Sequence, residues 1–136
     1  MKNRFFLFCI TACLLVFACR KDEKSERFTF LTTPIWVTDS LLANGVDASG
    51  PGGFLEDFKG EAKFAEDGTG YFGNYTGVWR FNLDETEITI VTEEMPLPII
   101  ADIVQLTAQS LKLTTTVTNP LSPTQTVNIR MTFKAK

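Results

Sequence analysis

Four pairs of adjacent carboxylates are the residues of this sequence best suited to acid–base chemistry. They are Glu56-Asp57, Glu66-Asp67, Asp84-Glu85 and Glu93-Glu94. General acid and base catalysis requires two groups that converge on one reacting site. Neighbouring residues of a strand point to opposite faces, and neighbouring residues of a turn usually both face water. Because every pair is adjacent in sequence and lies among turn-forming residues, we expect solvated acids and no enzyme.

Nucleophilic and metal-ligating residue types are scarce. The chain has no histidine and three cysteines, Cys9, Cys13 and Cys19. Without histidine, neither a Ser-His-Asp triad nor a Cys-His pair can form, and the usual ligands of zinc are missing. The stretch EDGTGY at residues 66–71 lacks the alternating acids and the late glutamate of an EF-hand calcium loop. We therefore expect no catalytic residue, no metal site and no cofactor.

All three cysteines lie in an amino-terminal segment that is typical of a secretory signal. Lys2 and Arg4 give it a positive start, and residues 5–18 are apolar apart from Thr11. This apolar stretch is shorter than the ~20 residues that a transmembrane helix needs, and the charged sequence RKDEK follows it after Cys19. We therefore predict a cleaved signal peptide over residues 1–18.

The end of this segment carries a second pattern. Val16-Phe17-Ala18-Cys19 has an aliphatic residue three positions before a cysteine and a small residue directly before it. It resembles the lipobox of bacterial lipoproteins, in which the cysteine thiol is acylated, the chain is cut before it and the new amino terminus is acylated too. The resemblance implies that Cys19 is a lipid anchor. Ile10-Thr11-Ala12-Cys13 is a competing lipobox, but its use would leave the apolar stretch LLVFAC on the mature chain.

The residues after Cys19 suggest a tether between an anchor and a domain. We predict a lipidated cysteine and polar tether over residues 19–32, because the charged residues 20–23 cannot pack into a core. Lys21-Asp22-Glu23 also resembles the export signal that sends lipoproteins of the Bacteroidetes to the outer face of the outer membrane, although a solvated spacer has the same pattern. Three acyl chains would hold the protein permanently on its membrane. We expect the outer membrane, with the cell surface favoured over the periplasmic face.

The mature chain has the composition of one globular domain. Loss of Lys2 and Arg4 with the signal leaves eleven basic residues against sixteen acidic ones. This acidic balance argues against nucleic acid as a partner, because binding to phosphates requires a basic surface. Loss of Cys9 and Cys13 and acylation of Cys19 would leave no thiol for a disulfide.

Beyond the tether, short apolar or alternating runs recur between turn signals. The pattern predicts strands over residues 35–42, 61–65, 70–75, 78–82, 87–92, 99–106, 111–118 and 126–134. The last alternates most clearly, with Val127, Ile129, Met131 and Phe133 on one face. Since most connections are short, we predict an all-β fold, an antiparallel up-and-down meander over residues 33–136 that closes into a barrel and so removes its edges.

Three stretches of this region resemble the lipocalin-like domains of many small bacterial lipoproteins. They are DGTGYF at residues 67–72, GVWRFNLDETEITI at residues 77–90, and VQLT followed by SLKL within residues 104–113. The likeness covers roughly residues 33–134 and implies a lipocalin-like barrel. Animal lipocalins carry a Gly-x-Trp motif on the first strand, whereas Gly77-Val78-Trp79 lies in the middle of this chain. The resemblance therefore bears on the fold more than on a ligand.

An eight-stranded barrel is either filled by its own side chains or wide enough for one small ligand. Strand alternation directs ten large apolar side chains inward: Phe64, Trp79, Phe81, Ile88, Ile90, Leu111, Leu113, Ile129, Met131 and Phe133. They could form an ordinary core. Alternatively, aromatic residues line a pocket, with Trp36, Phe64, Tyr71, Trp79 and Phe81 as candidates, and the glycine-rich residues 44–53 cover its mouth as a mobile lid or form a surface insertion.

Two classes of function remain. In the first, which we predict, the tethered barrel binds a small apolar or amphipathic ligand near the membrane. In the alternative, it is a packed interaction module that contacts another envelope protein or a glycan through loops such as EEMPLP at residues 93–98 and NPLSPT at residues 119–124. A cavity of about 300 Å³ or more would favour the first class, and a solid interior would favour the second.

Overall fold

The computed structural model describes residues 23–119 and 121–136, so the predicted signal peptide and Cys19 lie outside the described residues. The described chain begins with a short helix, α1 (Glu26–Thr32), and continues mainly as strands. These are β1 (Trp36–Ala43), β2 (Val46–Asp47), β3 (Glu61–Phe64), β4 (Thr69–Phe72), β5 (Tyr75–Phe81), β6 (Glu87–Thr92), β7 (Ile99–Leu106), β8 (Ser110–Asn119) and β9 (Ser122–Ala135). A turn of 3-10 helix, Glu56–Phe58, precedes β3. Within the described ranges, no helix has the length and apolar character needed to cross a membrane.

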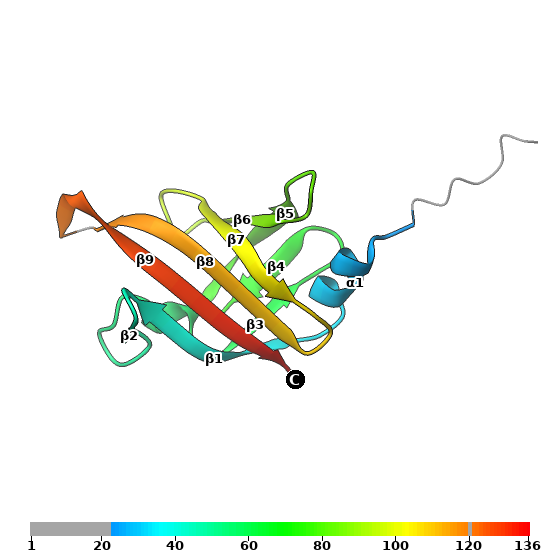
Figure 1. Ribbon diagram of the computed structural model, residues 1–136, viewed down its shortest axis with the longest axis horizontal. Helices are drawn as coiled ribbons and strands as arrows, with labels where there is room; N and C mark the ends of the chain where they lie inside the picture. The colour runs from blue at the N-terminus through cyan, green and yellow to red at the C-terminus, as the bar shows by residue number, and fades with distance from the viewer. Residues whose placement is uncertain (1–22, 120) are drawn as a thin grey trace, which may run out of the picture.

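The strands form one antiparallel sheet that closes on itself (Figure 1). From β3 onward each strand pairs with the next along the chain, and β9 returns to pair with β1. Since β1 also pairs with β3, eight strands close the barrel, and β2 is an extra strand beside the carboxyl end of β1. The predicted all-β meander closing into a barrel is confirmed.

The turn between β4 and β5 lies earlier than the sequence pattern suggested. Strands were expected over residues 70–75 and 78–82, but the turn falls at Gly73 and β5 continues through Gly77. Gly73 has a φ of +62°, which favours glycine. A Cβ at Gly77 would lie 2.0 Å from the carbonyl oxygen of Val91 on β6. This glycine therefore lets two paired strands approach closely and does not interrupt β5.

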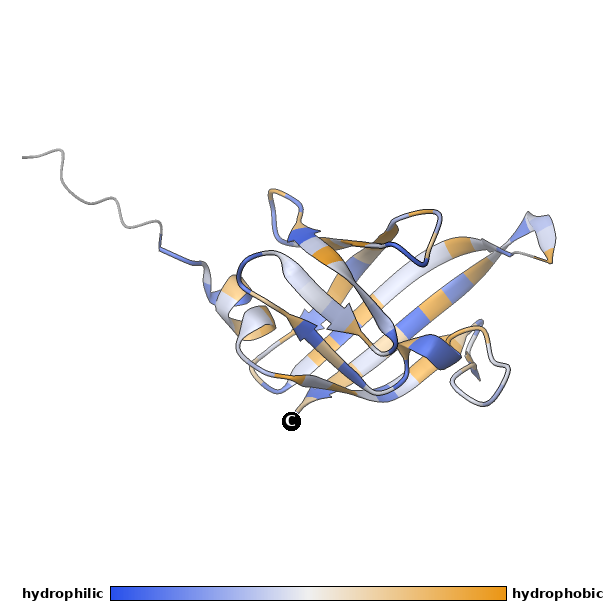
Figure 2. Ribbon diagram, turned by 180° about the vertical axis from the view of Figure 1, so that it is seen from behind, coloured by the Kyte–Doolittle hydropathy of each residue, from blue (hydrophilic) through white to orange (hydrophobic). Residues whose placement is uncertain are grey.

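The inner face of the barrel carries the side chains that strand alternation predicted. Nine of the ten are buried, and Phe81 is partly buried against them. The outward positions between them are polar or exposed, and the ribbons of β8 and β9 change colour along their length accordingly (Figure 2). The period-2 pattern was sufficient here because each long strand has one face against the core and one against water.

The predicted polar tether over residues 19–32 is too long, because its last seven residues form α1 and belong to the domain. The Ser25 hydroxyl caps this helix by accepting a hydrogen bond from the backbone N–H of Phe28 at 2.9 Å. Leu31 is fully buried and Thr32 nearly so. A helix of two turns is too short to show sustained periodicity, which explains why the sequence pattern missed it.

Candidate functional site

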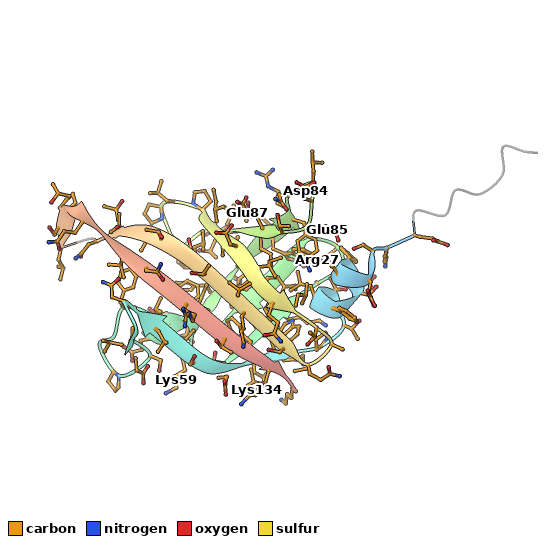
Figure 3. All side chains as sticks on the ribbon, viewed as in Figure 1. Arg27, Lys59, Asp84, Glu85, Glu87 and Lys134 are labelled. Atoms are coloured by element: carbon orange, nitrogen blue, oxygen red, sulfur yellow. The ribbon has the colours of Figure 1, made fainter. Side chains whose placement is uncertain are left out.

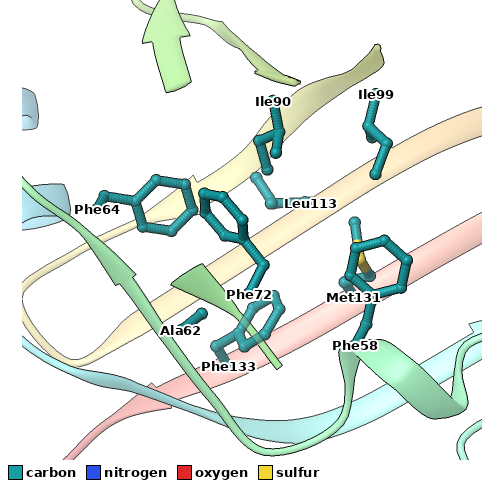
Figure 4. Close-up of a pocket in the computed structure, with 9 residues that line it drawn as sticks. All are labelled: Phe58, Ala62, Phe64, Phe72, Ile90, Ile99, Leu113, Met131 and Phe133. Atoms are coloured by element: carbon teal, nitrogen blue, oxygen red, sulfur yellow. The ribbon is translucent and has the colours of Figure 1, made fainter. Parts of the chain in front are cut away.

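The interior of the barrel is the candidate site (Figure 4). A cavity there is lined by Phe58, Ala62, Phe64, Phe72, Ile90, Ile99, Leu113, Met131 and Phe133, all of them apolar. Its volume is about 10 Å³. One buried water needs roughly 10–15 Å³, and a site for a small molecule needs about 300 Å³ or more. The interior is therefore filled by the protein's own side chains.

The predicted pocket residues do not form one wall. Phe64 lines the cavity. Trp36 and Trp79 are buried in the core around it, and Phe81 is partly buried against that core. The structure thus places four of the five predicted residues in or against the core, where they act as packing, and the fifth, Tyr71, lies elsewhere.

Tyr71 was expected to face the interior, and this prediction is wrong. Its direct partners across the sheet are Lys63 on β3 and Thr76 on β5. Directly paired residues of an antiparallel sheet share a face, and Thr76 is exposed whereas Phe72 is 3% exposed and lines the cavity. A four-residue strand with a glycine offers too little alternation to choose between the adjacent Tyr71 and Phe72.

Trp79 is the centre of an aromatic cluster. Its ring lies 5.5 Å from that of Phe64 and 5.4 Å from that of Phe81, both edge to face. The ring of Phe28, on α1, lies 5.8 Å away. The indole N–H donates a hydrogen bond to the carbonyl oxygen of Ala65 at 2.9 Å. Trp79 therefore joins β5, β3 and the helix, and its polar group is satisfied although the ring is buried.

α1 covers one end of the barrel. Trp36, at the start of β1, is fully buried, and its indole N–H donates to the carbonyl oxygen of Leu31 at 3.0 Å. The Ser25 hydroxyl lies 2.7 Å from both carboxylate oxygens of Glu85. Arg27 donates through Nε to the carbonyl oxygen of Glu85 at 2.9 Å, between the helix and the turn that joins β5 to β6 (Figure 3). These contacts hold the helix against the barrel at both of its ends.

Replacing Leu31 by alanine should lower the free energy of unfolding by about 2 to 3 kcal/mol, because a fully buried leucine leaves a cavity that the end of a helix can only partly close. Chemical denaturation followed by circular dichroism measures the loss. The control is Thr29→Ala on the exposed side of the same helix, which should change stability by no more than about 0.5 kcal/mol. Equal effects of the two variants would mean that residues 26–32 do not pack on the barrel and belong to the tether.

A folded segment covers the opposite end of the barrel, and the predicted mobile lid is part of it. The N–H of Ala48 donates to the carbonyl oxygen of Leu41, and the N–H of Leu55 donates to that of Ala48, both at 2.9 Å. Ala48, Leu55 and Phe58 are all buried. The glycines of residues 44–53 therefore mark tight turns in a packed cover, and composition alone could not distinguish that from mobility.

Two polar side chains lie near this cover. The Tyr75 hydroxyl donates to the Asp57 carboxylate at 3.3 Å. Burial of the phenol, together with the negative charge of Asp57, raises the pKa of Tyr75 above its ordinary value, so the hydroxyl stays protonated at neutral pH. The Thr92 hydroxyl is buried and has no hydrogen-bond partner among the described residues. The Thr92 hydroxyl therefore has no base within hydrogen-bond distance, whereas the Tyr75 hydroxyl is held in its protonated form beside the Asp57 carboxylate.

Residues of the acid pairs take part in local structure. Asp67 accepts hydrogen bonds from the hydroxyl and the backbone N–H of Thr69, at 2.6 and 2.9 Å, and they lower the pKa of its carboxyl. Its neighbour Glu66 forms an ion pair with Lys24. In the part of the chain that the structure describes, no three of the His, Cys, Asp and Glu side chains lie close enough to hold a metal ion.

No protein-family model matches this sequence, and no curated protein matches it significantly. The class of protein is therefore defined by its fold, a closed eight-stranded antiparallel β-barrel with one added strand and a helix over one end. This architecture is consistent with the lipocalin-like fold that the sequence resembles.

Proposed function

We propose that this protein is a small lipoprotein of the Bacteroidetes type, anchored through Cys19, whose lipocalin-like barrel is a packed, non-catalytic interaction module. One observation carries this proposal: the cavity inside the barrel has a volume of about 10 Å³, and both ends of the barrel are covered by packed segments. A ligand of even ten heavy atoms needs far more room. The filled interior therefore favours the second of the two function classes over ligand capture.

Exposed apolar side chains support the same proposal. The two loops suggested as contact surfaces carry Leu97, which is 74% exposed, and Leu121, which is 93% exposed. On the outer face, Val78 of β5 pairs directly with Val91 of β6, and both are about half exposed. Because the strands alternate in direction, the loops that carry Leu97 and Leu121 lie at the end of the barrel away from α1. Apolar surface displayed in this way is typical of contact sites between proteins.

The start of the domain is compatible with the proposed anchor. Five residues, 20–24, lie between Cys19 and Ser25, the cap of α1. The six Cα-to-Cα steps from Cys19 to Ser25 span at most about 22 Å, so an acylated Cys19 would attach the barrel at its α1 end and close to the membrane. Lys21, Asp22 and Glu23 lie within this tether and support a place at the cell surface.

A thermal-shift experiment with apolar probes tests the filled interior. Indole and a series of fatty acids should leave the melting temperature of the protein unchanged, because the cavity admits none of them. The matched control is Trp79→Ala, which removes a large buried ring and should bind indole in the space created, with a rise in its melting temperature. Saturable stabilisation of the unmodified protein by a fatty acid would restore ligand binding as the function.

A further inference from the structure

The hairpin of β8 and β9 extends beyond the rest of the barrel (Figures 1 and 2). β8 pairs with β7 only as far as Thr114, which lies opposite Asp102. A last contact is the hydrogen bond from the Thr115 hydroxyl to the carbonyl oxygen of Ile100, at 2.6 Å. On its other side β8 stays paired with β9 as far as Asn119. From Thr116 onward, then, β8 has an edge with no strand beside it among the described residues.

This free edge, residues 116–119, is short, but its side chains lack the charges that usually protect an exposed strand. Proteins guard such edges with charged side chains, proline or bulges. No charged residue occurs anywhere in residues 113–129. The neighbouring edge of β9 carries Pro123, which has no N–H to donate, whereas Thr116, Val117 and Thr118 are β-branched residues suited to strand pairing. Within the free edge, the regular pairing of β8 with β9 is interrupted only by the register shift between Thr118 and Asn119, at the far end of β8.

We propose that the free edges of β8 from two copies of this chain pair antiparallel and form a two-fold dimer. Unpaired backbone N–H and C=O groups in strand geometry are matched by another extended backbone. A two-fold axis brings the same segment of both copies together, and in this segment that places no like charges opposite each other, although the chain as a whole has a net charge of −3. An edge without charged side chains also cannot form ion pairs with a strongly charged partner.

The dimer specifies the partner of the interaction module proposed above and rests on that function. Because β8 runs away from α1, antiparallel pairing puts the two helices at the outer ends of an elongated pair. The two anchors would then leave from opposite ends, so the dimer would lie along the membrane. Anchoring both copies on one surface raises their effective concentration and favours a contact made by a short edge.

Cysteine cross-linking in intact cells tests the contact. The full chain is produced in two differently tagged forms, one with Thr116→Cys and the other with Thr118→Cys, and a mild oxidant is added. These two positions face each other when the two-fold axis passes through Val117. A disulfide-linked species carrying both tags is expected, because paired residues lie within the ~7 Å that a disulfide can bridge. Adding Thr118→Lys to the Thr116→Cys form and Thr116→Lys to the Thr118→Cys form should reduce this species about tenfold, since the two lysines then face each other across the edge.

Thr76 supplies the matched control. It is an exposed threonine on β5, a strand that is paired on both sides. Thr76→Cys should give no more cross-linking than the unmodified protein, whose mature chain would carry only the acylated Cys19. Equal cross-linking at Thr76, no two-tag species between positions 116 and 118, or a link to a different protein would each overturn the dimer. If fatty acids raise the melting temperature and the two-tag species still forms, the filled interior is contradicted and the dimer is not.

Discussion

Replacement of Trp79 by alanine is expected to lower the free energy of unfolding by about 3 to 5 kcal/mol, a large share of the roughly 5–15 kcal/mol that stabilises a typical domain. The side chain is 6% exposed, and its ring contacts three other aromatic rings from two strands and α1. Its removal leaves a cavity and takes away one of the two hydrogen bonds of the Ala65 carbonyl oxygen, which keeps the one from the N–H of Gly68. Denaturant titration measures the change, with Trp36 as the remaining fluorescent reporter.

Trp79→Phe is the matched control for this measurement. It keeps an aromatic ring in the cluster but loses the indole N–H, so about 1 to 2 kcal/mol should be lost through the hydrogen bond and the smaller ring. A loss below about 1 kcal/mol for Trp79→Ala would mean that the ring adjoins empty space. That result would contradict the packed interior and favour a ligand pocket.

Cys19→Ala should move the protein completely from the membrane fraction to the soluble fraction, since one thiol directs every acylation step of the proposed anchor. Cell fractionation combined with metabolic labelling by a fatty acid measures both the location and the modification. Cys13→Ala is the control and should change neither. Membrane attachment that survives Cys19→Ala but is lost in Cys13→Ala would assign the anchor to the competing lipobox.

The same cells show on which face the anchored protein lies. A protease added to intact cells should digest the unmodified lipoprotein if it is displayed at the surface. Replacing Lys21, Asp22 and Glu23 together by alanine should protect it without lowering its abundance. If the replacement leaves digestion unchanged, the three residues act only as a spacer.

The barrel could be predicted because its strands repeat one simple pattern. In β9, Ile129, Met131 and Phe133 are buried and alternate with Arg130 and Lys134, which are exposed. A one-residue shift in register would reverse every one of these positions, so the hydrophobic pattern determines the face. Short connections between successive strands then leave an antiparallel meander as the simplest topology.

Prediction failed where local composition has more than one structural meaning. Glycines served as a turn at Gly73, as a close-approach site at Gly77 and as turns within the packed cover of residues 44–53. Tyr71 and Phe72 are adjacent aromatic residues, and only the pairing of β4 with β3 and β5 shows which faces inward. α1 depends on contacts outside its own residues, above all with Glu85 in the distant β5–β6 turn and with Trp36 on the next strand.

The sequence by itself determined the all-β class, the number of barrel strands and most of the inward-facing side chains, because these follow from local alternation and turn chemistry. Tertiary structure decided how much space remains inside and how the barrel ends are closed. Those properties depend on how Phe58, Leu31 and the aromatic cluster around Trp79 fill the interior from segments far apart in the chain. The space left inside depends on the summed volume of side chains from the whole barrel, so no single stretch of sequence determines it.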